Sequence, residues 1–432
     1  MDARPDDPPK VRPTTAAMPA EPTVSGAPAS GGPVSEPDRI ASLDILRGVA
    51  VLGILTMNVG SFAMPSSAYF NPGIWGGFTG LDRLVYAATH LLFDLKFMAI
   101  FSMLFGAGIV LMSERRERQD RPATGLHYRR MAWLLVFGMA HAYLIWYGDI
   151  LVAYALCGSL VYLFRRKRPR TLVVLALLAM APGSLILLGA GLSLPAWPAE
   201  ALAEVRAELA PPPPALEAEV AAYRGSYADQ FRQRAATAVG MQTETFLFFM
   251  VWRVTGLMLL GMALFKLDVL AAAGSDRFYK RWIAAALLVG MPVIAYGLSV
   301  NAGRAWGMPE SFFLGLHFNY WGSLFVALGW ISVVMLACRK ELLPGLRSRL
   351  AAVGRMAFTN YIAQSVLGTF VFYGFGLGLF GSVDRVGQVG VVLAIWIIQL
   401  AWSPWWLERF RFGPLEWVWR SLVYWRMQPM RR

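Results

Sequence analysis

Cysteine is scarce in this chain of 432 residues, which contains only two. Cys157 and Cys338 fall inside or at the end of apolar stretches, so their spacing provides neither a disulfide framework nor a set of zinc ligands. The sequence also lacks a G-x-S-x-G nucleophile elbow, an H-E-x-x-H zinc motif and a G-x-x-x-x-G-K-S/T phosphate loop. These absences count against a hydrolase, a zinc protease and an ATP-driven pump, and no metal is expected.

Charged residues are also few, at 16% of the chain, against 56% hydrophobic residues, 16 tryptophans and a mean hydropathy of +0.48. This composition is typical of an integral membrane protein with aromatic side chains at the membrane interfaces. The formal net charge of +13 raises the possibility of nucleic-acid binding, but the cations gather on one side of the predicted bundle without any nucleic-acid motif. The lipid bilayer is therefore the expected partner, and no nucleic acid is expected.

Ten apolar stretches predict an all-α fold, a polytopic membrane helix bundle with about ten transmembrane helices. Most are long enough to cross a hydrocarbon core about 30 Å thick at a rise of about 1.5 Å per residue. The short fourth stretch continues from the third through a tight turn. The predicted spans are 45–64, 84–112, 131–146, 150–164, 172–194, 246–265, 282–300, 316–338, 356–375 and 389–406.

The distribution of Lys and Arg predicts the orientation of these spans. Basic loops follow every even-numbered span, whereas the loops after odd-numbered spans hold few cations. By the positive-inside rule both termini of this multi-pass protein should be cytoplasmic. The expected parts are a disordered cytoplasmic tail (1–38), a five-helix half (39–195), an outer, periplasmic loop (196–245), a second membrane half (246–407) and a basic aromatic cytoplasmic tail (408–432). In the outer loop, Pro211 to Pro214 separate two expected amphipathic helices.

Polar residues inside the spans are the best candidates for function, because ionisable groups in hydrocarbon are costly unless paired or hydrated. His90 and Asp94 are four residues apart on one face of the second span, and Lys96 is expected on another face. His141 is expected in the outer half of the third span, shortly before Asp149. All the candidates could converge on one hydrated cavity open to the outside: His141, Asp149 and Asn58 first, then His90, Asp94, Lys96, Arg253, Asn360, Tyr361 and Gln364.

Each candidate also has a purely structural interpretation. His141, Asn58, Asn360 and Gln364 can be interhelical hydrogen-bonding residues of the kind common in membrane bundles. Asp149 can be the N-cap of the fourth span. The pair of His90 and Asp94 can satisfy itself without any catalytic role.

Several motifs resemble the YeiB-like family of bacterial inner-membrane proteins, which carries the label domain of unknown function 418. The resemblance runs from about residue 38 onward, and the label supplies no reaction. The motifs are S-L-D-I-L-R-G at 42–48, A-Y-F-N-P-G at 68–73, K-F at 96–97, F-S-M-L-F-G-A-G at 101–108, W-Y-G-D-I-L-V-A-Y at 146–154, G-R-M-A-F-T-N-Y-I-A-Q-S at 354–365 and G-P-L-E-W-V-W-R at 413–420.

The opening L-D-x-x-R-G pattern is also similar to the first helix of transmembrane acyltransferases of the heparan-alpha-glucosaminide N-acetyltransferase type. That similarity implies transfer of an acyl group from cytosolic acyl-CoA to an envelope acceptor, a sugar or a lipid, with Asn58 matching an active-site Asn. The catalytic His of those enzymes has no counterpart in the loop 60–83. His141 is the expected substitute, as a base oriented by Asp149 or Asp94. Arg47 and Arg355 are the expected contacts for the phosphates of acyl-CoA.

Two other interpretations remain open. Five spans in each half would give the halves opposite orientations, as in inverted-repeat transporters, and buried ionisable residues would then form a proton or substrate path. An assembly or lipid-binding protein would explain the aromatic and basic tail. The acyltransferase is the favoured prediction, with donor, acceptor and oligomeric state left open.

Overall fold

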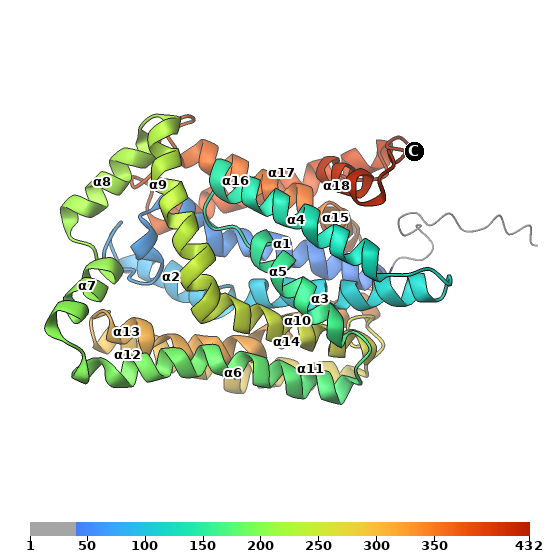
Figure 1. The fold of residues 1–432 in the computed structure, drawn as a ribbon, viewed down its shortest axis with the longest axis horizontal. Coiled ribbons are helices and arrows are strands. Elements are labelled where there is room, and N and C mark those ends of the chain that lie inside the picture. The colour runs from blue at the N-terminus through green and yellow to red at the C-terminus, as the bar shows by residue number, and fades with distance from the viewer. Residues whose placement is uncertain (1–39) are drawn as a thin grey trace, which may run out of the picture. The chain divides into compact units, whose positions relative to one another are not determined.

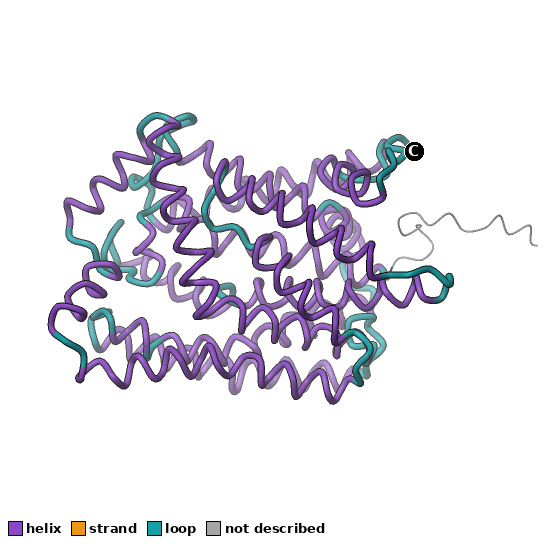
Figure 2. The backbone as a smooth tube through the Cα atoms, in the orientation of Figure 1, coloured by secondary structure: helices purple, strands orange, loops and turns teal. Residues whose placement is uncertain are grey.

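The computed structural model describes residues 40–432, so the predicted tail 1–38 lies outside the described residues (Figure 1). Within this range every regular element is helical apart from one isolated β-bridge between Phe410 and Arg431, as Figure 2 shows. The predicted all-α fold is therefore confirmed.

The helices of the first half follow the apolar stretches of the sequence. They are α1 (Ala41–Ala63), α2 (Gly80–Leu92), α3 (Lys96–Glu117), α4 (Thr124–Leu144), α5 (Leu151–Val161) and α6 (Pro169–Ser193). The helices of the remaining chain are α7 (Ala199–Leu209), α8 (Pro213–Arg224), α9 (Tyr227–Gly240), α10 (Val251–Lys266), α11 (Asp276–Ala285), α12 (Met291–Gly303), α13 (Glu310–Phe313), α14 (Leu316–Arg339), α15 (Pro344–Arg355), α16 (Ala357–Phe372), α17 (Arg385–Arg409) and α18 (Pro414–Tyr424).

Seven helical stretches within residues 40–432 are long and apolar enough to cross a membrane, which makes the chain a multi-pass membrane protein. They are Ala41–Ala63, Gly80–Glu117, Pro169–Ala196, Tyr227–Lys266, Asp276–Gly303, Glu310–Arg339 and Arg385–Arg409. The predicted third, fourth and ninth spans correspond to α4, α5 and α16, which are not among the seven. The count of ten and the cytoplasmic termini stay predictions.

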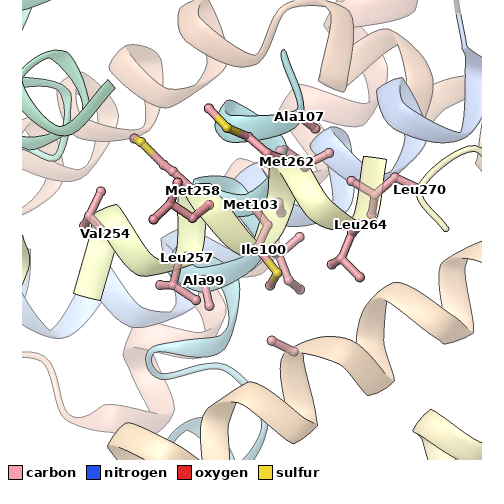
Figure 3. Close-up of a cluster of buried hydrophobic side chains, with 14 of the residues drawn as sticks. Ala99, Ile100, Met103, Ala107, Val254, Leu257, Met258, Met262, Leu264 and Leu270 are labelled. Atoms are coloured by element: carbon pink, nitrogen blue, oxygen red, sulfur yellow. The ribbon is translucent and has the colours of Figure 1, made fainter. Parts of the chain in front are cut away.

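Close helix contacts at glycine build the centre of the bundle. A Cβ atom at Gly106 of α3 would lie 2.0 Å from the Met258 carbonyl oxygen of α10, and one at Gly261 would lie 1.9 Å from the Met103 carbonyl oxygen. Glycine at both positions therefore lets the two backbones touch. Figure 3 shows the apolar side chains around this crossing, including Ile100 and Leu257.

A second glycine crossing joins two motifs that are about 300 residues apart in the sequence. A Cβ atom at Gly48 of α1 would lie 2.0 Å from the Leu350 carbonyl oxygen of α15, and one at Gly354 would lie 1.9 Å from the Asp44 carbonyl oxygen. The L-D-x-x-R-G motif and the start of the G-R-M-A-F motif therefore meet backbone to backbone.

The second predicted span is not one continuous helix. The residues Phe93–Asp94–Leu95 separate α2 from α3, and Leu95 has a left-handed φ of 62°. The expectation that Lys96 lies on a different face from Asp94 is therefore wrong, because the break changes the helical register between them. Both side chains reach the same partner on α14.

The predicted outer loop contains the two expected helices on either side of the proline run, α7 and α8. A third helix, α9, begins with a capping box at Ser226 and Asp229 and continues through the π-helical segment Met241–Met250 into α10. One uninterrupted helix therefore joins the predicted loop to the membrane bundle, across the expected boundary at residue 245. Figure 1 shows α7 and α8 at one end of the bundle and α18 toward the other.

Candidate catalytic site

The centre of the candidate site is a buried chain of three hydrogen-bonding side chains. His141, in the last turn of α4, places Nδ1 2.8 Å from Asp149 Oδ1 and Nε2 2.9 Å from the Ser365 hydroxyl of α16. All three side chains are buried. If neutral His141 donates from Nδ1 to Asp149, its Nε2 accepts the Ser365 proton, which is the arrangement of a serine nucleophile with its base and orienting carboxylate.

Local structure around Asp149 fixes its position in the turn between α4 and α5. The Val152 amide donates to Asp149 Oδ2 at 2.8 Å, which leaves Oδ1 for the imidazole. Gly138 of α4 permits this approach, because a Cβ atom there would lie 2.7 Å from the Val152 nitrogen and 3.0 Å from Asp149 Oδ2. Asp149 therefore satisfies the start of α5 and orients His141 at the same time.

Aromatic residues enclose the imidazole. The ring centroid of Tyr361 lies 5.2 Å from that of His141, and the Ile150 amide donates to the Tyr361 hydroxyl at 3.4 Å. The Trp146 ring lies 6.2 Å from His141 and is 2% exposed, and its Nε1 has no hydrogen-bond partner among residues 40–432. The aromatic wall of the site thus includes a buried indole whose N–H is unused within the described residues.

Ser365 was not among the residues predicted from sequence, although it ends one of the family motifs. It lies 224 residues from His141 in the chain, and no serine motif marks it. Its only sequence signal is its place one helical turn after Tyr361, on the same face of α16.

Asn58, the third predicted catalytic residue, lies on the side of α1 that faces α16. It shares this face with Val51, whose carbonyl accepts a hydrogen bond of 3.1 Å from Gln364, and with Phe62, whose ring lies 4.4 Å from the Trp146 ring. Its side chain is half-buried and makes no hydrogen bond to any of residues 40–432. Asn58 therefore lies on the side of α1 that faces α16, without a hydrogen bond to His141 among residues 40–432, and its catalytic role stays a prediction.

The other predicted residues of α16 belong to a structural network with α17. Asn360 donates to the Val353 carbonyl and to Ser403, each at 3.1 Å. Gln364 donates to Gln399 at 2.9 Å, and Gln399 in turn donates to the Asn360 carbonyl. Membrane helices are commonly held together in this way.

A second polar cluster, which we call the Asp94 cluster, forms at the break between α2 and α3. Asp94 accepts hydrogen bonds from Tyr69, from Asn319 at 2.8 Å and from His90 at 3.1 Å. Lys96 is fully buried and donates to Asn319 at 2.6 Å and to the His90 carbonyl. No hydrogen bond within residues 40–432 joins this cluster to His141, and the single cavity stays a prediction.

Arg253 of α10 is buried against Tyr320, the residue that follows Asn319 of the Asp94 cluster. Its guanidinium donates to the Tyr320 carbonyl at 2.7 Å and to Ser323 at 2.6 Å, and its Cζ lies 4.4 Å from the Tyr320 ring centroid. These contacts tie α10 to α14.

The predicted phosphate contacts lie at the glycine crossing of α1 and α15. Arg47 pairs with Asp44 at 2.7 Å, and Arg355 ends α15 directly after Gly354. Arg130 of α4 stacks over Trp419 of α18 at 5.0 Å.

Among residues 40–432 no group of three or more His, Cys, Asp or Glu is arranged to hold a metal ion.

Long apolar helices, buried polar clusters and helix crossings at glycine define a multi-pass α-helical membrane protein. The model of the family described as protein of unknown function (DUF418) matches residues 264–426. The uncharacterized protein YxaH of Bacillus subtilis is 33% identical over 91% of this chain and 96% of its own length. The uncharacterized protein YeiB of Escherichia coli is 32% identical over 89% of this chain and 96% of its own length. The chain belongs to the DUF418 family, the YeiB-like family.

Proposed function

We propose that this protein is an acyltransferase of the bacterial inner membrane that passes an acyl group from cytosolic acyl-CoA to an acceptor in the envelope. The observation that carries this proposal is the hydrogen-bonded chain from Ser365 through His141 to Asp149. In membrane surroundings a reactive triad of this kind is expensive to bury and has a direct chemical use.

The proposed reaction has two halves. Ser365 Oγ attacks the thioester carbonyl while His141 Nε2 takes the hydroxyl proton, and that proton leaves with the CoA thiol. The acceptor hydroxyl or amine then gives its proton to His141 and attacks the acyl-serine, which restores the Ser365 hydroxyl. Asp149 holds the imidazole tautomer and stabilises its charged form in both halves.

The Trp146 indole supports the same chemistry. Its buried N–H has no partner within residues 40–432, and the centroid of its ring lies 6.2 Å from that of His141. A donor in this position can stabilise the oxyanion that forms in each half of the reaction.

We propose that acyl-CoA, the acyl donor, binds near the end of α4 opposite His141. Arg130 lies eleven residues before His141 on this helix, a distance of about 16 Å along its axis. The arginines near the α1–α15 crossing would hold the acyl-CoA phosphates, and the thioester would reach inward to Ser365. The resemblance of the L-D-x-x-R-G motif to transmembrane acyltransferases supports this direction of transfer, with a sugar or lipid as acceptor.

Purified protein in sealed proteoliposomes, given radiolabelled acetyl-CoA, tests the proposal. We expect CoA release and label on Ser365 in the native protein, and neither in Ser365→Ala. Ser102→Ala is the matched control, because Ser102 is a buried serine of α3 that bonds to Tyr154 at 2.8 Å outside the triad. Equal turnover in native protein and Ser365→Ala would remove the serine mechanism.

A transporter is the second candidate, and the Asp94 cluster favours it. Discontinuous helices with buried ionisable side chains are the usual substrate and ion sites of transporters. This alternative predicts accumulation of a solute in the same vesicles without covalent change, and loss of that accumulation in Asp94→Asn.

A further inference from the structure

The helices of the predicted outer loop are fixed to the end of the bundle that holds His141. From α9, the Tyr227 hydroxyl donates to the Leu144 carbonyl and Arg234 Nε donates to the Tyr143 carbonyl, each at 2.8 Å. On α8, Glu219 accepts from the Ser66 amide at 3.0 Å. Both carbonyls of α4 come within three residues of His141, so α9 lies directly against the candidate site.

Arg234 is the unusual residue in this contact. Its side chain is 0% exposed, and neither Nη1 nor Nη2 has a hydrogen-bond partner among residues 40–432. The rings of Tyr227 and Phe231 lie 5.2 Å and 5.9 Å from its Cζ, which restricts the guanidinium without satisfying its N–H groups. A buried cation with unused donors is costly, and an anion would remove that cost.

Two further buried hydroxyls belong to the packed cluster that contains Ala238, one helical turn after Arg234. The hydroxyls of Tyr223 and Tyr373 are buried and have no partner within the described chain, and their rings are 4.7 Å apart. Burial raises the pKa of the Tyr223 phenol, and the charge of Glu219 acts in the same direction, while the charge of Arg234 acts in the opposite direction. Trp146, whose N–H also has no partner within residues 40–432, belongs to the same packed cluster.

We propose that Arg234, Tyr223 and Tyr373 form a binding site for a phosphate group beneath α8 and α9. A phosphate ester offers several oxygens in different directions to a guanidinium and two hydroxyls, whereas a carboxylate offers two oxygens in one plane. The site lies against the end of α4, so the phosphate is assigned to the acceptor; this assignment alone rests on the proposed acyl transfer. The phosphate belongs either to a lipid headgroup or to a water-soluble phosphate.

The structural alternative is that Arg234 only caps α4. Its Nε bonds to a carbonyl of the last turn, where a cation interacts favourably with the helix dipole. This role needs no ligand, so it predicts no difference in phosphate binding between native protein and a variant that lacks the charge.

Binding is measured on the full-length purified protein with two probes. Radiolabelled inorganic phosphate is titrated in detergent, and phosphatidylglycerol retained from mixed nanodiscs is counted by native mass spectrometry. The variants are Arg234→Gln and Tyr373→Phe, and Arg232→Gln is the matched control, because Arg232 is an exposed arginine of α9 paired with Asp229.

We expect at least about tenfold weaker binding in Arg234→Gln, as expected for lost charge-assisted hydrogen bonds, and unchanged binding in Arg232→Gln. Binding of free phosphate identifies a soluble ligand, and binding of the lipid alone identifies a headgroup. If Arg234→Gln does not fold, phosphate binding by Tyr373→Phe tests the proposal, because this substitution removes one hydroxyl only. Weaker binding than in the native protein is then the expected result. Equal binding of both probes to native protein and to the folded variants overturns the proposal. Ser365→Ala should keep full binding, so failure of acyl transfer and failure of this site are distinguishable.

Discussion

The Asp94 cluster and the His141 triad differ in how their polar groups are satisfied. In the Asp94 cluster, both carboxylate oxygens and the Lys96 ammonium have partners within the cluster, and Asn319 joins them. In the His141 triad, an imidazole that donates to Asp149 leaves Nε2 to accept from Ser365, so that the bonds can run in one direction; the Ser365 hydroxyl also lies 3.5 Å from the Tyr361 carbonyl. The closed arrangement is suited to holding a helix break in place, and the directional one is suited to proton transfer.

The strongest test of this difference is on activity. Ser365→Ala should lower CoA release by about 10³-fold or more, as expected for removal of a nucleophile, with little change in thermal stability. Turnover is measured in proteoliposomes, and stability by the unfolding midpoint in detergent. A parallel loss of folded protein would mean that Ser365 has a structural role like that of the Asp94 cluster.

The Asp94 cluster should respond in the opposite way. Asp94→Ala leaves Tyr69, His90 and Asn319 without their shared acceptor, and removes the buried negative charge that Asn319 links to Lys96, so we expect a loss of about 3–5 kcal/mol in the free energy of unfolding. The unfolding midpoint measures this loss, and Asp94→Asn combined with Lys96→Met should recover part of it. An unchanged midpoint in Asp94→Ala would contradict the structural role.

Two tryptophans sharpen the comparison with the same chemical change. Trp146→Phe removes an unpartnered N–H beside His141, and should lower turnover by about 10²-fold with unchanged stability. Trp330→Phe removes an N–H that donates to the Leu92 carbonyl at the end of α2, and should cost about 1 kcal/mol of stability with unchanged turnover. Turnover and the unfolding midpoint are measured for both variants. Loss of stability alone in Trp146→Phe, or loss of turnover alone in Trp330→Phe, would contradict the role assigned to that tryptophan.

The smallest expected effect concerns Glu219, which belongs to neither cluster. Burial raises the pKa of this carboxyl, so the folded protein binds the proton more tightly than the unfolded chain does. The contribution of this protonated carboxyl to the free energy of unfolding is complete below the unfolded pKa of about 4.3. It is lost as the pH rises through the folded pKa. Melting temperatures between about pH 4 and pH 8 should therefore fall further in native protein than in Glu219→Gln. Parallel curves would exclude this carboxyl as a source of pH dependence.

The helices and part of the triad were predictable, because both depend on near neighbours in the sequence. Apolar runs indicated the helices, and His141 and Asp149 are eight residues apart across one turn. Ser365 and Asn319 could not be found in this way, since each meets its partner only through packing of distant helices. The break at residues 93–95 contains neither proline nor glycine, so its cause is the set of side-chain contacts that hold it, not local propensity.

The helix from Tyr227 to Lys266 is uninterrupted, so α9 and α10 are parts of one long helix. Its first turns carry Arg234, and its far end crosses α3 at Gly261 with direct backbone contact. A tilt of α9 must therefore either move α10 against α3 or be absorbed by bending in the π-helical segment between them. The straightness of the π-helical segment therefore decides how much of a movement of α9 reaches the backbone contact between α10 and α3.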